Sequence, residues 1–404
     1  MNLLYISNEY PPETGYGGIG TYTKYCAEGM AARGHRVHVL CRSESGEPYT
    51  TTAAGVIVHR ISPGSYPIPS GRFFFPLRKL CYRAIPECLI RLAWARQALT
   101  CFQKEFSGRV QIDIVEYPEC GGEGFYVSTL PDIVKIVRLH TPWEMVRKLD
   151  RLRQPLADQY LLSHLERSAA RRASFVTSPT QALAGILKHR WRLPDCIVIP
   201  NPIPLSEFTA TEGNDLLFLG RIEYRKGVHL LIEAYSALCR RINPPRLRLV
   251  GKPYGKLPDG ADYGASITRL IAVVPDNGVV EWIQGVKAYS VIDYLRKSSI
   301  AIFPSLWENL SYACLEAMAS GCAVIATKCG GFPEMITHGK TGLLVEPYNV
   351  AALTEALMKL ISQPELLRTM GKNARTHVLN TYNSAIVCAQ IETMYLEFLK
   401  QKAC

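Results

Sequence analysis

The chain has 404 residues, enough for two domains, and its 48% hydrophobic and 20% charged residues are ordinary for a soluble globular protein. No apolar stretch approaches the roughly 20 residues that span a bilayer, and Met1–Ser7 reads as a strand rather than a signal peptide, so a cytoplasmic location is predicted. The 13 cysteines include no Cys-x-x-Cys pair, which argues against disulfide scaffolds and zinc sites.

The formal net charge of +11 is concentrated in the first half of the chain. Residues 1–200 carry 25 Lys and Arg against 17 Asp and Glu, whereas residues 201–404 carry 21 against 18. An acidic partner is therefore expected at the N-terminal half, and no nucleic-acid partner is predicted.

The first half opens with a β–loop–α–β unit that is typical of a doubly wound domain. Leu3–Ser7 is a predicted strand, Thr21–Arg33 a helix and Val37–Leu40 the next strand. The loop between the first two lacks the Gly-x-Gly-x-x-Gly spacing of dinucleotide binders. Gly17 and Gly18 come just before the helix, where backbone N–H groups can approach a phosphate; the alternative is a flexible loop with turn glycines.

Residues 71–104 combine aromatic and basic side chains. This composition suits a helix that rests on an anionic membrane surface or against a lipid-linked acceptor. The alternative is a helix pair that packs into the domain and leaves its arginines solvated. The side chains concerned are Arg72, Phe73, Phe74, Phe75, Arg78, Lys79, Arg83, Arg91, Trp94 and Arg96.

Two further strands, Ile112–Val115 and Ile133–Leu139, are predicted before a basic helical segment, Trp143–Arg172, which reads as a solvated face. His140 follows the second strand directly, at the carboxyl edge of the sheet. A lone histidine is more often structural than functional, so both roles stay open on position alone.

The domain boundary is predicted near residues 202–212. Ile197–Ile203 is the segment that closes the first half, and Asn201-Pro202 within it favours a turn into a linker. The expected domains are 1–205 and 206–383, with a final amphipathic helix at about 384–404 added to the first.

The second half restarts with a strand, Leu216–Leu219, and a loop that holds two cations. Arg221 and Lys226 lie just before a helix that begins near Gly227. Positive charge at a helix N-terminus opposes the macrodipole, but it suits a loop that binds an anion such as phosphate.

The stretch Ser305–Gly321, SLWENLSYACLEAMASG, lies between two buried strands, Ser299–Phe303 and Ala323–Ala326. Glu308 is placed in the loop before a helix, and Glu316 a little over two turns along it. The structural alternative is an acidic N-cap and one solvated glutamate. The apolar neighbours of Glu316 make an unpaired carboxylate costly, which favours a ligand hydroxyl as its partner.

Together these motifs resemble the retaining glycosyltransferases of family 4. The family's Glu-x7-Glu signature appears as Glu308 to Glu316, followed by LEAMASGCAVIAT, and its Gly-Arg-x4-Lys-Gly pattern contains Arg221 and Lys226. The resemblance implies an α/β, GT-B fold: two Rossmann-like doubly wound domains facing across a cleft, with the C-terminal helix crossing back to the N-domain. It assigns the first domain to the acceptor and the second to a nucleotide-sugar donor.

The resemblance also implies roles for these residues. Arg221 and Lys226 would hold the donor diphosphate, Glu308 the hydroxyls of the transferred sugar, and Glu316 the ribose. Backbone N–H groups of Asn309 and Leu310 would add hydrogen bonds. Here the sequence has Glu-Asn-Leu-Ser where the family commonly has Glu-Gly-Phe-Gly, which leaves the sugar preference open.

In the first half, the resemblance implies that Gly17, Gly18 and Gly20 contact the donor diphosphate. It implies that His140 contacts the transferred sugar, with Thr141 and Trp143 on the same wall. Some members of the family dock on membranes, so peripheral contact with the inner face of the membrane is a second possibility beside a purely cytoplasmic location.

The predicted reaction moves a sugar, with retention, from a nucleoside-diphosphate sugar to a hydroxyl acceptor, which is a sugar, a lipid-linked or polysaccharide precursor, or a small-molecule glycoside. No Asp-x-Asp motif is present, so Arg221 and Lys226 are expected to replace a metal, and no cofactor is predicted. His140, Glu308, Arg221 and Lys226 are the catalytic candidates. Two alternatives stay open: a non-catalytic nucleotide-sugar-binding subunit and a GT-B-fold sugar-nucleotide epimerase.

Overall fold

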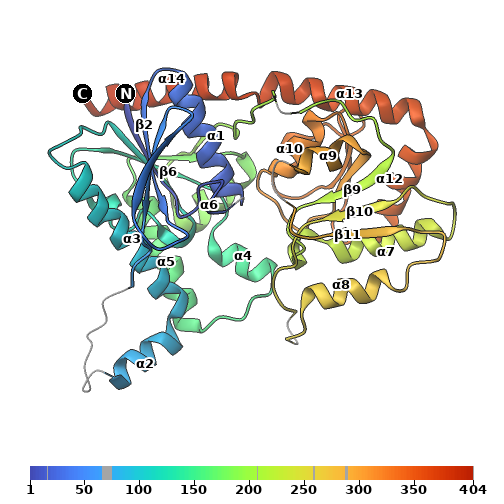
Figure 1. The fold of residues 1–404 in the computed structure, drawn as a ribbon, viewed down its shortest axis with the longest axis horizontal. Helices are drawn as coiled ribbons and strands as arrows, with labels where there is room; N and C mark the ends of the chain where they lie inside the picture. Colours follow the sequence, from blue (N-terminus) through green and yellow to red (C-terminus); the bar gives the residue numbers. More distant parts are fainter. Residues whose placement is uncertain (16, 66–74, 207, 258–259, 287–289, 404) are drawn as a thin grey trace. The chain divides into compact units, whose positions relative to one another are not determined.

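The computed structural model describes residues 1–15, 17–65, 75–206, 208–257, 260–286 and 290–403 (Figure 1). The chain forms two compact units. The N-terminal unit comprises Met1–Val146, Gln154–Pro202 and Ser384–Cys404. The C-terminal unit comprises Arg147–Arg153 and Ile203–Asn383.

The N-terminal unit contains an eight-stranded sheet in the order β3-β4-β2-β1-β5-β6-β7-β8. All neighbouring strands are parallel except β3 and β4. The strands are β1 (Asn2–Ile6), β2 (Arg36–Arg42), β3 (Tyr49–Ala53), β4 (Val56–Ile61), β5 (Ile114–Pro118), β6 (Val134–Arg138), β7 (Phe175–Ser178) and β8 (Ile197–Val198). The helices are α1 (Gly18–Ala32), α2 (Phe75–Ala84), α3 (Pro86–Glu105), the first part of α4 (Trp143–Leu149) up to Val146, α5 (Leu156–Arg172), α6 (Gln181–Trp191) and α14 (Ser384–Ala403), with short 3-10 turns η2 (Cys120–Gly122) and η3 (Val127–Thr129).

The C-terminal unit contains a six-stranded parallel sheet in the order β11-β10-β9-β12-β13-β14. The strands are β9 (Asp215–Leu219), β10 (Leu247–Val250), β11 (Val280–Ile283), β12 (Ser298–Phe303), β13 (Ala323–Thr327) and β14 (Leu343–Val345). The helices are α7 (Val228–Cys239), α8 (Tyr263–Ile271), α9 (Val291–Arg296), α10 (Tyr312–Ala319), α11 (Phe332–Met335), α12 (Val350–Ser362) and α13 (Pro364–Thr381), with one 3-10 turn, η4 (Tyr224–Lys226).

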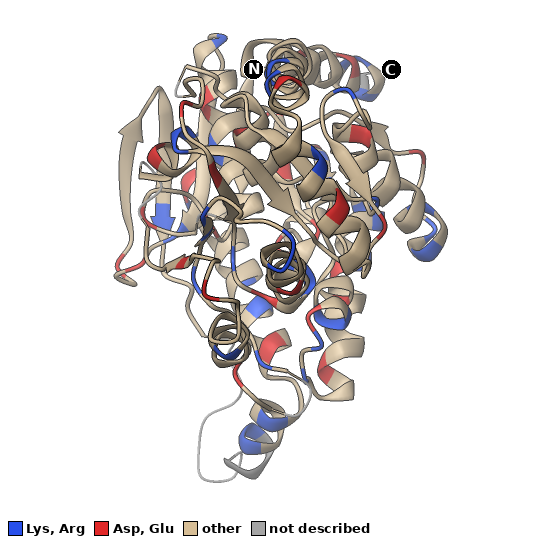
Figure 2. Ribbon diagram, turned by 90° about the vertical axis from the view of Figure 1, so that its right-hand side faces the viewer, with Lys and Arg blue, Asp and Glu red and all other residues tan. Residues whose placement is uncertain are grey.

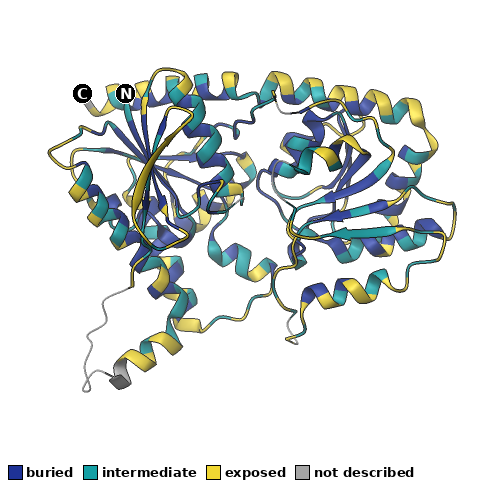
Figure 3. Cartoon of the chain, in the orientation of Figure 1, coloured by how far each residue is buried: buried dark blue, intermediate teal, exposed yellow. Residues whose placement is uncertain are grey.

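Central strands are buried along their whole length, as parallel strands covered on both faces require (Figure 3). In the C-terminal unit, Ile302 of β12 pairs with Ile325 of β13, and both lie in one apolar core with Leu216 of β9 and Leu247 of β10. The prediction of two Rossmann-like α/β units is therefore confirmed. The final helix α14 belongs to the N-terminal unit, where it packs against α1 and β6.

Several elements differ from their predicted limits. The strands β3 and β4 were not predicted, and β5 begins at Ile114 rather than Ile112. The basic segment 143–172 contains two helices rather than one, because Arg151 adopts left-handed backbone angles and Pro155 caps α5. Arg72, Phe73 and Phe74 of the predicted aromatic cluster lie outside the described residues.

In the part of the chain that the structure describes, no helix has both the length and the apolar character that a membrane crossing requires.

Candidate active site

Two loops of the C-terminal unit meet at the middle of its sheet. The strands β9 and β12 are neighbours, but the chain leaves β9 toward β10 and leaves β12 toward β13, in opposite directions. Such a change of direction opens a crevice at the carboxyl ends of the two strands, where α/β proteins bind ligands. The loops that follow β9 and β12 carry the predicted residues Arg221, Lys226, Glu308, Asn309 and Leu310.

A glycine allows the two loops to touch. Gly227 caps α7 with φ +68°, and a Cβ at this position would lie 2.0 Å from the Pro304 carbonyl oxygen. The Leu306 N–H donates to the Arg225 carbonyl at 2.7 Å, which joins the same two loops. The final glycine of the Gly-Arg-x4-Lys-Gly pattern therefore has a steric reason as well as a conformational one.

The structure brings Lys226 and Glu308 together. The Lys226 ammonium forms an ion pair with Oε2 of Glu308. Arg221 has a more open position: 52% of its side chain is exposed, one guanidinium nitrogen lies 3.2 Å from Glu223 Oε2, and the group lies 5.0 Å from the centre of the Tyr254 ring. In this loop, Lys226 is thus paired with the Glu308 carboxylate, whereas Arg221, although it contacts Glu223, keeps half of its side chain accessible to an anion.

Glu308 is buried, and its backbone is held on a second side by the loop after β13. The Gly331 N–H donates to the Glu308 carbonyl at 2.9 Å, and a Cβ on Gly330, at φ +52°, would lie 1.7 Å from that oxygen. Burial by itself raises the pKa of the Glu308 carboxyl, but Lys226 and then Arg225 outweigh it and hold the pKa below its usual range. Glu308 is therefore ionised at neutral pH.

The helix that carries Glu316 begins later than predicted. Helix α10 starts at Tyr312, and the Ser311 hydroxyl caps it by accepting the Cys314 N–H at 3.4 Å. Glu316 is thus the fifth residue of α10, little more than one turn along it rather than two, and is half-buried. Asn309 and Leu310 are buried and precede the cap.

In the N-terminal unit, β1 and β5 form the corresponding point of divergence, and the glycine-rich loop follows β1. The Glu9 side chain, which the sequence did not single out, lies against this loop. A Cβ on Gly15, at φ +64°, would lie 2.6 Å from Glu9 side-chain atoms, and one on Gly17 would lie 2.7 Å from Glu9 Oε2. A Cβ on Gly18 would meet nothing within 4 Å, and one on Gly20 would lie 2.9 Å from the Gly15 carbonyl.

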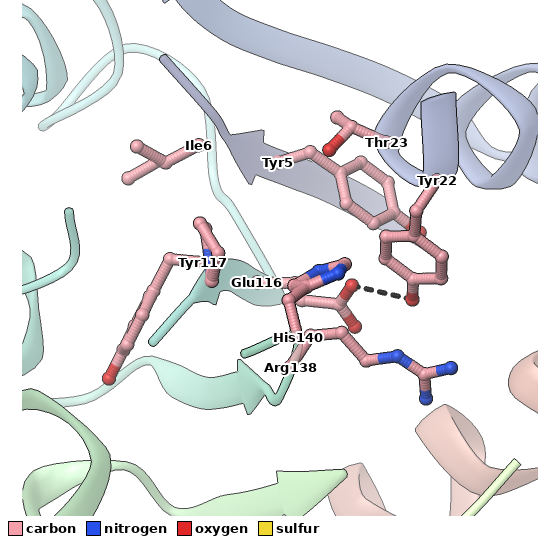
Figure 4. Close-up of a pocket in the computed structure, with 9 residues that line it drawn as sticks. Tyr5, Ile6, Tyr22, Thr23, Glu116, Tyr117, Arg138 and His140 are labelled. Atoms are coloured by element: carbon pink, nitrogen blue, oxygen red, sulfur yellow. Dashed lines mark hydrogen bonds between the residues drawn. The ribbon is translucent and has the colours of Figure 1, made fainter. Parts of the chain in front are cut away.

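His140 follows β6 and lines a small pocket of the N-terminal unit (Figure 4). Its ring lies edge-on to Tyr22, with 5.2 Å between ring centres. Tyr22 donates from its hydroxyl to Glu116 Oε1 at 2.8 Å, and Tyr395 of α14 donates to Oε2 at 2.6 Å. Burial and then Arg138 lower the pKa of His140 to about 3, so its imidazole is neutral at physiological pH.

Buried carboxyls, which the sequence reading did not assign, hold the loops around His140. Glu119 Oε2 accepts the His140 N–H at 2.7 Å, and Glu166 Oε1 accepts the N–H groups of Gly121 at 2.7 Å and Trp143 at 2.9 Å. Burial, and for Glu119 also the neighbouring Glu166, raises the pKa of each carboxyl to about 8. For Glu119, the available sequence signal was an acidic residue between a proline and a glycine, directly after a buried strand; Glu166 lies inside α5 and had no such signal.

Trp143 packs into a helix cluster of the N-terminal unit. Its indole packs against Cys88, Leu162 and Leu165, and its Nε1 donates to Gln154 Oε1 at 3.1 Å. The ring therefore contributes to the packing of α3 and α5.

A buried ion-pair cluster in the C-terminal unit was also missed. Arg225 contacts Glu223 and Glu308 from nearby loops, and Asp150 from residues 147–153. Asp150 lies in the segment that was predicted to be a solvated face, and no sequence pattern links it to Arg225, because 75 residues separate them.

Among the described residues, no three or more His, Cys, Asp or Glu side chains are grouped as metal ligands.

Comparison with protein families gives two matches that cover consecutive parts of the chain. Residues 16–207 match the family described as Glycosyltransferase Family 4, and residues 205–377 match Glycosyl transferases group 1.

Among individual proteins, the chain is 26% identical over 397 residues to the D-inositol 3-phosphate glycosyltransferase of Arthrobacter sp. (strain FB24), covering 91% of this chain and 87% of that protein. Among solved structures, sucrose-phosphate synthase from Thermosynechococcus elongatus superposes with a TM-score of 0.76 at 20% identity, covering 99% of both chains. Anabaena HepE in complex with UDP-glucose superposes with a TM-score of 0.70 at 16% identity, covering 98% of this chain and 100% of that one.

Proposed function

The chain belongs to the family 4, group 1 glycosyltransferases, and from this premise we propose that it transfers a sugar, with retention of anomeric configuration, from a nucleoside-diphosphate sugar to a hydroxyl acceptor. One observation carries the proposal. At the crevice between β9 and β12, Arg221 and Lys226 lie in the same loop, and Lys226 contacts the ionised Glu308. Cations and a carboxylate side by side suit a ligand that has both a diphosphate and sugar hydroxyls.

In this proposal, Arg221 and Lys226 stabilise the diphosphate as it leaves the sugar. Arg221 is accessible to an anion, and Lys226 is a flexible point charge that can turn from Glu308 to a phosphate oxygen. These two side chains then neutralise the charge of the leaving diphosphate, as a metal ion does in other enzymes, and no cofactor is required. Glu308 accepts hydrogen bonds from the sugar hydroxyls, Glu316 from the ribose, and Asn309 and Leu310 donate backbone N–H groups.

The bond changes balance without an enzymic nucleophile. The bond between the anomeric carbon and the diphosphate oxygen breaks, and the acceptor hydroxyl oxygen bonds to the same face of that carbon. The hydroxyl proton passes to the departing diphosphate. The neutral imidazole of His140 exchanges a hydrogen bond with the transferred sugar rather than supplying the proton.

We assign the acceptor to the N-terminal unit and the donor to the C-terminal unit. In addition, we assign Gly17 and Gly18 of the N-terminal unit to the donor diphosphate, because Gly18 has open space where a Cβ would be. The acceptor is a sugar, a lipid-linked precursor or a small-molecule glycoside.

We also assign the protein to the cytoplasm. The cysteines of the described residues are free thiols, which favours a reducing compartment.

We also assign peripheral membrane contact to helix α2 of the N-terminal unit. Its exposed side chains include the cations Arg78, Lys79 and Arg83 and the apolar groups Leu80, 62% exposed, and Tyr82. No acidic residue occurs in α2, and Figures 2 and 3 show its basic and exposed character at the lower end of each view. A basic helix with exposed apolar groups suits an anionic lipid surface.

A thermal-shift panel tests the donor assignment. UDP, GDP, ADP and their glucose and mannose conjugates are added to the protein, and we expect one nucleotide series to raise the melting temperature by mass action. The stabilising donor is then incubated with candidate acceptors, and the released nucleoside diphosphate and the anomeric configuration of the product are measured. Release of nucleotide without any glycoside product, or an inverted product, would contradict the proposal.

A further inference from the structure

A buried guanidinium lies between the two proposed diphosphate-binding cations in the sequence. Arg225 is in the turn η4, and three carboxylates surround it. Its Nη2 is 2.6 Å from Glu223 Oε1, its Nε is 3.2 Å from Asp150 Oδ2, and its Nη1 is 3.6 Å from Glu308 Oε2. Arg225 has no role in the reaction as proposed above.

The backbone of Arg225 is held as firmly as its side chain. Its N–H donates to Asp150 Oδ1 at 3.0 Å, and its carbonyl accepts the Leu306 N–H at 2.7 Å. Leu306 lies two residues before Glu308 in the loop after β12. Arg225 therefore connects residues 147–153, the turn η4 and the loop that carries Glu308, and its guanidinium has little freedom to move.

Lys226 and Arg225 compensate Glu308 in different ways. Lys226 touches the carboxylate, but its flexible stem lets the ammonium move to another anion. Under the proposed function, that anion is the donor diphosphate. Once Lys226 has moved, Glu308 would be a buried carboxylate with Arg225 as its remaining cation among the described ion pairs. A buried carboxylate without a cation is costly and tends to take up a proton.

We propose that Arg225 is a positioning residue that keeps Glu308 ionised and in place while Lys226 contacts the donor diphosphate. Asp150 and Glu223 hold the guanidinium in the orientation that this requires. The inference rests on the proposed function and adds to it. Arg221 and Lys226 bind the diphosphate, and Arg225 stabilises the charge of the Glu308 carboxylate, which binds the sugar.

The protonation states agree with this division. Burial alone lowers the pKa of Arg225, but Glu223, Glu308 and Asp150 together raise it well above its ordinary value, so the guanidinium stays charged. Burial and then Glu223 raise the pKa of Asp150, whereas Arg225 lowers it, and the resulting pKa is about 6. Arg221 also acts on Glu308 and lowers its pKa, though less than Lys226 and Arg225 do, and the thiols of Cys314 and Cys329, which also interact with Glu308, are kept neutral by burial.

The test compares Arg225→Gln with the wild type in nucleotide binding and in the pH dependence of turnover. We expect the affinity for UDP, or for GDP or ADP if the wild type prefers one of them, to stay within about threefold, because Arg225 does not touch the diphosphate. We expect turnover to fall about 10- to 100-fold, as for a misplaced catalytic group. The acid limb of the turnover–pH profile should move upward by about one pH unit, because Glu308 loses a nearby cation.

Three further variants make the result decisive. Arg225→Lys keeps the positive charge without the fork geometry, and it should restore the acid limb but only part of the turnover. The double variant Arg225→Gln with Asp150→Asn removes one buried negative charge together with the cation. If Arg225→Gln alone does not fold, the same binding and pH measurements are made on this double variant. Arg241→Gln is the matched control, since Arg241 pairs with Glu355 on an exposed surface of the same unit, and it should change nothing.

An acid limb that does not move in a folded variant overturns the inference. Equal losses in nucleotide affinity and in turnover also overturn it, because they would make Arg225 a diphosphate ligand. If the wild type transfers sugar from none of the donors, the proposed function itself fails. An active wild type whose Arg225→Gln variant is equally active refutes the role of Arg225 alone.

Discussion

At the scale of single residues, the contact between Lys226 and Glu308 joins two groups with different proposed partners. We expect Lys226→Ala to weaken binding of the free nucleoside diphosphate by about 10- to 100-fold, the usual effect of losing a charged hydrogen bond. Glu308→Gln should leave that affinity nearly unchanged but lower turnover by about 100-fold or more, because its hydrogen bonds are to the sugar. Calorimetry and initial rates measure the two effects separately.

Lys328→Ala is the matched control for this pair of variants. Lys328 forms a 2.9 Å ion pair with Glu346 on an exposed surface of the same unit, so neither nucleotide affinity nor turnover should change. Wild-type nucleotide affinity in Lys226→Ala would contradict the assignment of Lys226 to the diphosphate.

Gly15, in the loop after β1, and Gly18, the first residue of α1, should respond differently to alanine. Gly15→Ala places a Cβ against the Glu9 side chain in a left-handed backbone conformation, and we expect it to destabilise the protein by about 1–3 kcal/mol. Gly18→Ala meets no neighbouring atom, so stability should be unchanged while donor affinity falls. Denaturant unfolding and nucleotide-sugar titration measure the two quantities. Unchanged donor affinity in Gly18→Ala would remove this residue from the proposed donor site.

At the scale of elements, helix α2 of the N-terminal unit has an exposed face that is both basic and apolar. We expect Arg78→Glu with Lys79→Glu to weaken binding to vesicles of anionic phospholipid by about 10-fold or more, at about 1 kcal/mol for each cation. Added salt should weaken wild-type binding in the same direction. Co-sedimentation with vesicles measures both effects.

The control for α2 lies in the other unit. Lys359→Glu with Lys372→Glu changes the net charge equally at two exposed positions of α12 and α13. Equal losses of vesicle binding in both double variants would mean that net charge, and not α2, governs the interaction.

At the scale of the whole molecule, buried ionisable groups make the stability of the fold depend on pH. Folding raises the pKa of Glu119 and Glu166 to about 8, so their stabilisation is present at low pH and is lost as pH rises through 8. Folding lowers the pKa of His38 to about 4 and that of His140 to about 3, so their stabilisation is present above about pH 6.5 and is lost as pH falls. The two trends oppose each other.

We therefore expect the melting temperature to fall as pH rises from about 6.5 to about 8, where only the carboxyl contributions change, while between about pH 4.5 and 6.5 the carboxyl and histidine contributions oppose each other. Glu119→Gln keeps an oxygen that can accept the His140 N–H but cannot ionise, so it should flatten the decline above pH 7. Calorimetric scans between pH 4.5 and about pH 9 measure the profile. A melting temperature that rises steadily from pH 6.5 to about pH 9 would contradict the raised pKa values of these carboxyls.

Local patterns were sufficient to predict most of the fold. Runs of apolar residues such as 299–303 and 323–326 mark strands buried on both faces, and glycines or caps mark the helices between them. The hairpin of β3 and β4 was missed because β3 is exposed along its length and has no apolar alternation. The break at Arg151 to Pro155 was missed because the flanking segments are both good helix formers.

The sequence by itself determined the α/β class, the family, and the residues that the family's motifs place at the carboxyl ends of β9 and β12, because these depend on residue types and short spacings. Only the tertiary structure decided which groups surround these residues and compensate their charges. It brought Asp150 to Arg225 and placed Glu9 against Gly15. It also bonded Glu119 to the His140 N–H and Glu166 to the Trp143 N–H. The physical reason is that the cost of a buried charge depends on which distant segments surround it, and no local pattern records that.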